Sequence, residues 1–316
     1  MAQQQIETMS SLSTWLPALW PYRYTSPTPE ELRQRRELLT LRGEYAQLST
    51  LILLLMFSVY SFAARRRTGS SKDDKWAGGR SSSLPLSAWL ESPLMRDGTE
   101  TRGQYLVATV WMMWLFGLSA WRAGDDYLHL TKSLAHTALA TIPFSFLLSP
   151  KLSPTAHPFN LICSHLLHVP QTHLTPYHRL LGRLVIPTLV SLHSFLYIMF
   201  FVQNGLLEKR LNDADVQLGI FAFLALAGLW GASGWVAGWA RGKRYSTSRL
   251  VSGSGSKRAA YVLHVVLVLV VLGTVYFHVE YSRRYVVQAL VIYGVDVGSW
   301  VIKQVLRTGV GGMAAR

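Results

Sequence analysis

The chain has few charged residues and a single cysteine, and each shortage narrows what the protein can be. Charged residues make up 15% of the 316 positions, whereas 50% are hydrophobic. The hydrophobic residues gather in runs of about 20, the length of a bilayer-spanning helix, which a soluble globule of this size does not need. Because Cys163 is the only cysteine, neither a disulfide framework nor a thiolate metal cluster can form within the chain. Any bound iron must therefore have other ligands.

Acidic residues are also scarce, with 17 Asp and Glu against 31 Lys and Arg, which gives a net charge of +14. Such an excess can indicate nucleic-acid binding. Here the basic residues form short clusters between the apolar runs, for example at 65–67, 241–244 and 257–258. Charge in these places is typical of the flanks of membrane helices. The sequence therefore predicts membrane lipid, and no nucleic acid, as a partner.

The apolar runs predict an all-α integral membrane bundle of about seven transmembrane helices. We place them at roughly 46–64, 103–122, 127–149, 178–202, 216–239, 259–280 and 284–305. The expected divisions are a polar tail with some amphipathic helix at 1–45, the first span and a basic flexible loop at 46–102, a transmembrane domain at 103–307, and a short tail at 308–316.

The distribution of Lys and Arg predicts how this multi-pass chain lies in the membrane. If all seven stretches cross, the segments 65–102, 150–177, 241–258 and 306–316 share one side and together hold more basic residues than the opposite segments. The positive-inside rule then places the N-terminus outside and the C-terminus in the cytosol. The expected location is the plasma membrane, with an endomembrane as the alternative.

Four of the ten histidines fall inside two apolar stretches: His178 and His193 in the fourth, His264 and His278 in the sixth. An imidazole in hydrocarbon is costly without a partner, so it marks a candidate functional site. His264 and His278 are 14 residues apart, about 21 Å along a helix and about 40° short of four turns. The two stretches run parallel, so His178 should face His264, and His193 should face His278. Each pair can supply both axial ligands of a b-type haem, which favours electron transfer.

One spacing departs from this pattern. His178 and His193 are 15 residues apart, and the extra residue turns His193 by about 100° more than a 14-residue spacing would. Pro187 lies between them and removes a helical hydrogen bond. We therefore predict a one-residue π-bulge near this proline, which would restore the facing of the two rings. The alternative is that these histidines only hydrogen-bond to neighbouring helices.

At these residues the chain resembles the ferric reductase-like transmembrane domain of fungal metalloreductases and NADPH oxidases. The likeness runs from about 103 to 307 and includes DYLHLTKSLAHTALATIPFSFLLSP at 126–150, YHRLLGR at 177–183, the helix around Gly219, the YVLH and FH segments ending at His264 and His278, and YVVQALVIYGVDVGSW at 285–300. The resemblance implies a six-helix core with two haems ligated by His178, His193, His264 and His278. Arg183 either meets a haem propionate or is an interfacial arginine.

The resemblance also shapes what we expect of partners. Members of the family continue into flavin- and NADPH-binding domains, and this sequence shows neither, so we expect it to bind neither FAD nor NADPH. A separate flavoprotein reductase or another donor would supply electrons, and ferric or cupric ions or oxygen would accept them. Two alternatives stay open: a non-catalytic regulatory or assembly partner of a full-length reductase or oxidase, and an ascorbate-dependent di-haem cytochrome. Whether the chain is an enzyme by itself is undecided.

The other six histidines cluster before the fourth stretch. They are His129, His136, His157, His165, His168 and His173. His165 and His168 are three residues apart and could share a helix face with His173 beyond, which permits a metal site, but we expect all six side chains to be interfacial or solvated.

Overall fold

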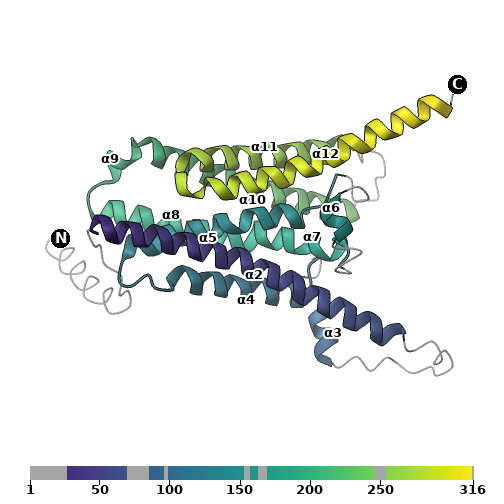
Figure 1. Cartoon of the computed structure of the whole chain (residues 1–316), viewed down its shortest axis with the longest axis horizontal. Coiled ribbons are helices and arrows are strands. Elements are labelled where there is room, and N and C mark those ends of the chain that lie inside the picture. The colour runs from purple at the N-terminus through teal and green to yellow at the C-terminus, as the bar shows by residue number, and fades with distance from the viewer. Residues whose placement is uncertain are drawn as a thin grey trace.

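The structure, a computed structural model, describes residues 27–69, 85–95, 99–152, 157–162, 169–245 and 254–314. Over these residues the fold is helical apart from one isolated β-bridge, Pro93 to Thr101 (Figure 1). The long helices are α2 (Pro29–Gly69), α4 (Arg102–Ala120), α5 (Tyr127–Leu148), α8 (Ile186–Gln203), α10 (Ala214–Tyr245), α11 (Ser254–His278) and α12 (Arg283–Ala314). The short ones are α3 (Pro85–Glu91), α6 (Pro158–Leu161), α7 (Gln171–Leu180), η2 (Leu181–Val185), α9 (Leu207–Leu211) and η3 (Glu280–Ser282).

The predicted all-α membrane bundle is confirmed. A helix lies at each of the seven predicted stretches, and α7, η2 and α8 together form the fourth. Among the described residues, five of these helices are long and apolar enough to cross a bilayer by themselves. Helices α4 and α5 are the two that are not, although they lie alongside the others in the bundle (Figure 1).

Helix α5 is less apolar because it lies at the centre of the bundle, where it packs against α2, α4, α8 and α12. Three of its buried threonines form hydrogen bonds within the protein instead of facing lipid. Thr131 and Thr141 donate to carbonyls of their own helix, and Thr137 lies 3.1 Å from the hydroxyl of Ser119 on α4. Such bonds satisfy polar groups where no water reaches.

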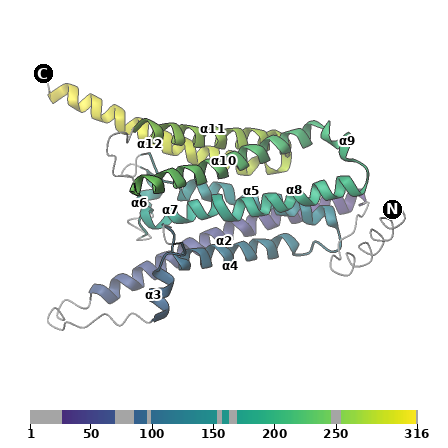
Figure 2. The same cartoon turned by 180° about the vertical axis from the view of Figure 1, so that it is seen from behind.

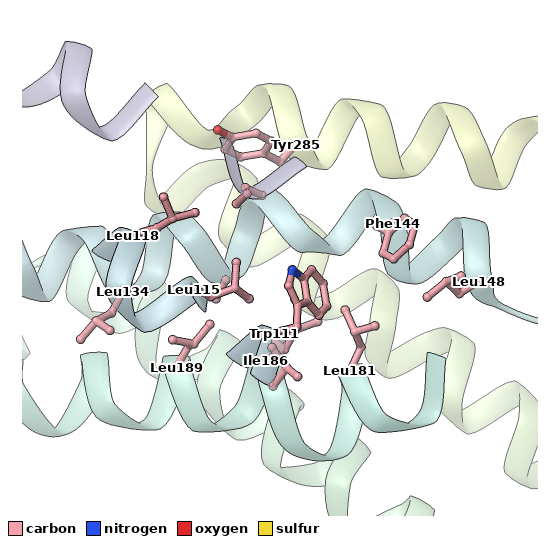
Figure 3. Close-up of a cluster of buried hydrophobic side chains, with 14 of the residues drawn as sticks. Trp111, Leu115, Leu118, Leu134, Phe144, Leu148, Leu181, Ile186, Leu189 and Tyr285 are labelled. Atoms are coloured by element: carbon pink, nitrogen blue, oxygen red, sulfur yellow. The ribbon is translucent and has the colours of Figure 1, made fainter. Parts of the chain in front are cut away.

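The main apolar core joins α4, α5, η2 and α8 (Figure 3). Trp111 of α4 meets Phe144 of α5, with the two rings edge to face and 6.1 Å apart, and Leu115 of α4 belongs to the same cluster. Leu181 and Leu189 close the cluster from η2 and α8. A smaller core joins α11 to α12. The two cores together hold the histidine-bearing helices on either side of α5.

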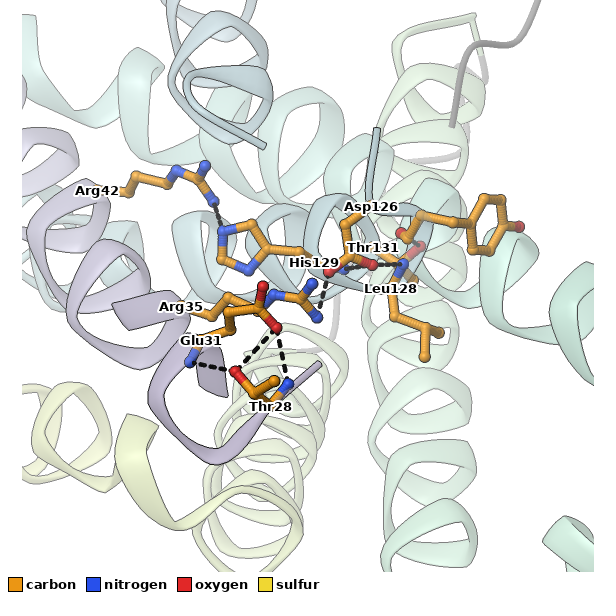
Figure 4. A network of polar contacts seen from close by, with 9 residues as sticks. Thr28, Glu31, Arg35, Arg42, Asp126, Leu128, His129 and Thr131 are labelled. Atoms are coloured by element: carbon orange, nitrogen blue, oxygen red, sulfur yellow. Dashed lines mark hydrogen bonds and ion pairs between the residues drawn. The ribbon is translucent and has the colours of Figure 1, made fainter. Parts of the chain in front are cut away.

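The first helix is longer than predicted, because α2 begins at Pro29 instead of about residue 46. The expected boundary of the polar tail at 45 therefore falls inside a helix. Two of the charged residues that suggested a tail have partners at the start of α5: Arg35 pairs with Asp126, the N-cap of α5, at 2.5 Å, and the buried Arg42 donates to Nε2 of His129 at 3.0 Å (Figure 4). Residues 1–26, including the expected amphipathic stretch, lie outside the described residues.

The far end of the chain also differs, since α12 continues to Ala314 where a short tail was expected from 308. The C-terminal ends of α2, α10 and α12 lie at the same end of the bundle as α3 and α6 (Figures 1 and 2). This grouping matches the predicted sharing of one side by the basic segments. Much of the two expected basic loops, at 70–84, 96–98 and 246–253, lies outside the described residues.

Candidate functional site

Two parallel helices carry the four histidines that the sequence singles out. His178 lies on α7 and His193 on α8, which continue one another through η2. His264 and His278 lie on α11. We call the continuous segment α7–η2–α8 and helix α11 the two rods, and α10 runs in the opposite direction between them (Figure 2). The parallel course expected for the fourth and sixth stretches is therefore present.

The first pair, His178 and His264, is brought together across the two rods. Their ring centroids are 6.4 Å apart, and the ring planes are inclined at 67°. A metal–imidazole bond of about 2 Å places each ring centre about 3 Å from the metal, so two imidazoles on opposite sides of one metal have centres about 6 Å apart. The observed separation leaves room for one metal ion between the rings.

The protein orients three of the four imidazoles in the same way. The Nδ1–H of His178 donates to the carbonyl of Ser145 at 2.9 Å, that of His193 to Thr131 at 2.8 Å, and that of His278 to Asp215 at 2.5 Å. A carbonyl oxygen only accepts, so each Nδ1 carries the proton and each Nε2 presents a lone pair. Carbonyl groups that fix histidine tautomers in this way are typical of metal-ligating imidazoles.

The second pair, His193 and His278, lies at the other end of the same two helical segments. The ring of Tyr197 packs edge-on against His193, with centroids 5.0 Å apart. On α10, Gly219 leaves space for His278: a methyl group there would lie 3.0–3.4 Å from three atoms of the ring. Helix α10 therefore both orients His278, through Asp215, and approaches it closely, through Gly219.

The predicted π-bulge between His178 and His193 is confirmed. Residues Leu181–Val185 form a π-helix, and the N–H of Ile186 bonds to the carbonyl of Leu181 five residues earlier. Pro187 follows at once and has no N–H to give to the carbonyl of Arg183. The indole of Trp230 on α10 donates to that carbonyl at 3.2 Å. The extra residue of the 15-residue spacing is thus absorbed before α8 begins.

Arg183, the fifth predicted site residue, lies on the π-helix and is partly exposed. One of its guanidinium nitrogens is 3.9 Å from the carboxylate of Glu100, which is too long for a hydrogen bond. Arg179, one turn earlier, holds the same carboxylate at 2.5 Å. Arg183 therefore keeps donors for another acceptor, while Arg179 is engaged.

The other six histidines were expected to be interfacial or solvated, and this expectation is wrong for His129, His136 and His157. The first two are buried on α5, where polar helix neighbours replace water: His129 accepts from Arg42, and His136 bonds to the hydroxyl of Tyr285 at 3.1 Å. His157 is also buried, and burial lowers its pKa. His173 is exposed as expected, and His165 and His168 lie outside the described residues. Within the described part of the chain, no group of three or more metal-ligating side chains is present.

Sequence reasoning missed the groups that hold the histidines. The carbonyls of Thr131, Ser145 and Asp215 are backbone atoms, so residue type gives no sign of them. Glu100 was missed because it precedes α4, far in sequence from the arginines it contacts. The motif around 178–183 contains those arginines, but only the fold shows which acid they meet.

The fold and the paired histidines together define a multi-pass, all-helical membrane protein with imidazoles placed in two layers. Residues 134–275 match the family model described as ferric reductase like transmembrane component. This part of the chain is therefore similar to a ferric reductase-like transmembrane domain, a similarity that suggests transmembrane electron transfer. The match contains His178, His193 and His264 and ends three residues before His278. No curated protein and no solved structure matches the chain.

Proposed function

We propose that the chain carries electrons across a membrane through two b-type haems, held by His178 with His264 and by His193 with His278. The observation that carries the proposal is the shared arrangement of His178, His193 and His278, whose Nδ1–H groups bond to carbonyls of neighbouring helices. Each Nε2 then has its lone pair available for iron, and the first pair has the ring separation that a shared metal requires.

The residues present fit two bis-histidine haems. Bound between two imidazoles, a haem supplies one-electron redox chemistry with no open iron position. The chain itself holds the imidazoles in place and in one tautomer. The carbonyls that fix His178 and His193 belong to Ser145 and Thr131 of the central helix α5. Arg183, with donors to spare beside the first pair, would receive a propionate as a bidentate partner.

The proposal extends to direction and partners. The described helices contain no nucleotide-binding fold, so we propose that a separate flavoprotein reductase delivers electrons to the His178–His264 end. The acceptor at the His193–His278 end would be a ferric or cupric ion, or oxygen, as in a metalloreductase system. We propose an outward N-terminus and a cytosolic C-terminus in the plasma membrane, since the helix ends near the basic segments lie together.

The test is the number of haems per chain and how single substitutions change it. We expect a dithionite-reduced b-type spectrum with about two haems per chain in the purified protein. His264→Ala and His278→Ala should each remove one haem and leave the other. An absence of haem from the wild-type protein, or loss of both haems from each variant without unfolding, would contradict the proposal.

A second substitution tests the outer layer without removing a ligand. Gly219→Ala places a methyl group against the ring of His278 and should release or distort only the haem of that pair. Gly228→Ala is the matched control on the same helix, because its methyl group meets only Leu267 at an ordinary 3.6 Å. Equal haem content in the two variants would show that the close approach of α10 does not matter.

The same spectra decide between the alternatives. A non-catalytic regulatory or assembly partner would bind no haem, and the 15-residue spacing was the sequence feature that favoured it. The π-helix weakens that argument because it compensates for the extra residue. An ascorbate-dependent di-haem cytochrome would bind haem and be reduced rapidly by ascorbate, which a flavoprotein-fed conduit need not be.

A further inference from the structure

Glu100 is a buried carboxylate outside the matched family segment. It lies just before α4, with 5% of its residue surface exposed. Its backbone carbonyl accepts from Leu94, and the β-bridge between Pro93 and Thr101 holds this turn together. Thr101 then caps α4 through a capping box with Gln104. The carboxylate therefore sits on a turn that is anchored on both sides.

Its partners are two arginines that flank the start of the π-helix. The Nε of Arg179 donates to the carboxylate at 2.5 Å, and Arg183 approaches it to 3.9 Å. Arg179 directly follows His178 in the chain, and Arg183 belongs to the π-helix. The carboxylate on the α3–α4 side is thus bonded to Arg179, the residue after His178, and Arg183 lies nearby without a hydrogen bond to it.

The carboxylate is ionised at neutral pH. Burial by itself would raise the pKa of Glu100, but the hydrogen bond and the charge of Arg179, with a smaller effect of Arg183, hold the pKa below its ordinary value. The carboxylate of Glu100 and the guanidinium of Arg179, the residue after His178, are therefore a pair of fixed charges close to the first histidine pair, and Lys151 adds a positive charge near His178. A fixed charge near a redox centre changes the relative stability of its oxidised and reduced forms.

We propose that Glu100 is a positioning residue for the His178–His264 site: it holds the guanidinium of Arg179 beside this site and thereby sets the fixed charge that determines the site's redox potential. This inference rests on the proposed haem function. It adds that a residue outside the family segment tunes one of the two haems and leaves the other unchanged.

Substitution of Glu100 and substitution of Arg179 should shift the midpoint potential of this site in opposite directions. Reduction adds one negative charge, so Glu100→Gln should favour the reduced form and Arg179→Gln the oxidised form. At an effective dielectric constant of about 20, a unit charge about 12 Å away changes such an equilibrium about tenfold, which is about 59 mV for one electron. The double variant Glu100→Gln/Arg179→Gln removes both charges and should return the midpoint potential close to the wild-type value.

The experiment is a spectroscopic redox titration of the detergent-solubilised full chain. A His278→Ala background leaves only the first site, so its potential is read alone. A His264→Ala background leaves only the second site, whose potential should move far less. Glu208→Gln is the matched control, because Glu208 is an exposed carboxylate on α9 at the opposite end of the bundle.

Shifts of opposite sign for Glu100→Gln and Arg179→Gln, with recovery in the double variant, would support the proposal. Shifts in the same direction, or none while haem is retained, would overturn it and leave the proposed function standing. If the wild-type protein binds no haem, the proposed function fails. Thermal unfolding of the wild type, Glu100→Gln, Arg179→Gln and the double variant then still tests whether Glu100 holds Arg179 in place. Coupled losses would support the Glu100–Arg179 attachment, and additive losses would refute it.

Discussion

Deleting one residue from the π-helix tests whether that segment exists to align His178 with His193. At about 100° per residue, 15 residues of regular α-helix would carry His193 about 60° beyond four full turns. Fourteen residues end about 40° short of four turns, which is the relation between His264 and His278. Removing Gly182 should convert Leu181–Val185 into regular α-helix and give both rods the same 14-residue spacing.

The expected result is that the Gly182 deletion keeps both haems. Gly182 is exposed, and nothing lies within 4 Å of the position a Cβ would take, so its removal takes no packed side chain from the core. Deletion of Ser191, which is also exposed, is the control. It shortens the chain equally but lies between the π-helix and His193, so it turns that ring by about 100° and should cost the second haem.

The assay is haem content per chain together with the reduced-minus-oxidised spectrum of each purified variant. Thermal unfolding of the same samples separates a lost haem from a lost fold. The reasoning would be refuted if the Gly182 deletion lost the second haem while remaining folded. It would also be refuted if the Ser191 deletion kept both haems.

Two further predictions concern stability in detergent. Gly43→Ala would place a methyl group against the hydroxyl of the buried Tyr285. This overpacking should lower the free energy of unfolding by about 1–3 kcal/mol, which would be measured as a lower unfolding temperature. Gly117→Ala is the control, because its methyl group would meet nothing within 4 Å and should leave the unfolding temperature unchanged. The pKa of Glu100 is lower in the folded protein than in the unfolded chain, so its ionised carboxylate stabilises the fold at pH values above the unfolded-state pKa of about 4.3. The stability difference between wild type and Glu100→Gln should be greatest near neutral pH, and it should be lost as the pH falls through the lowered folded-state pKa. A difference that stays constant as the pH falls from 7 to the acid limit of folding would contradict this assignment.

The sequence by itself determined the class of fold and the candidate ligands. Runs of apolar residues specify membrane helices because the bilayer leaves a hydrophobic segment few other choices. Histidines inside such runs stand out because an imidazole there needs a partner. Even the π-helix was predictable, since a 15-residue spacing and Pro187 conflict with a regular helix that faces His264 and His278. These are local properties, and residue spacing records them.

Other features depended on tertiary structure. The start of α2 at Pro29 could not be read from residues 29–45, because their charges look solvated until Asp126 and His129 of α5 are placed beside them. The burial of His129 and His136 depended on α5 being central. The carbonyls that orient the imidazoles, and the attachment of Glu100 to Arg179, join segments far apart in the chain. Spacing along one helix cannot record them, because contacts between helices are set by packing.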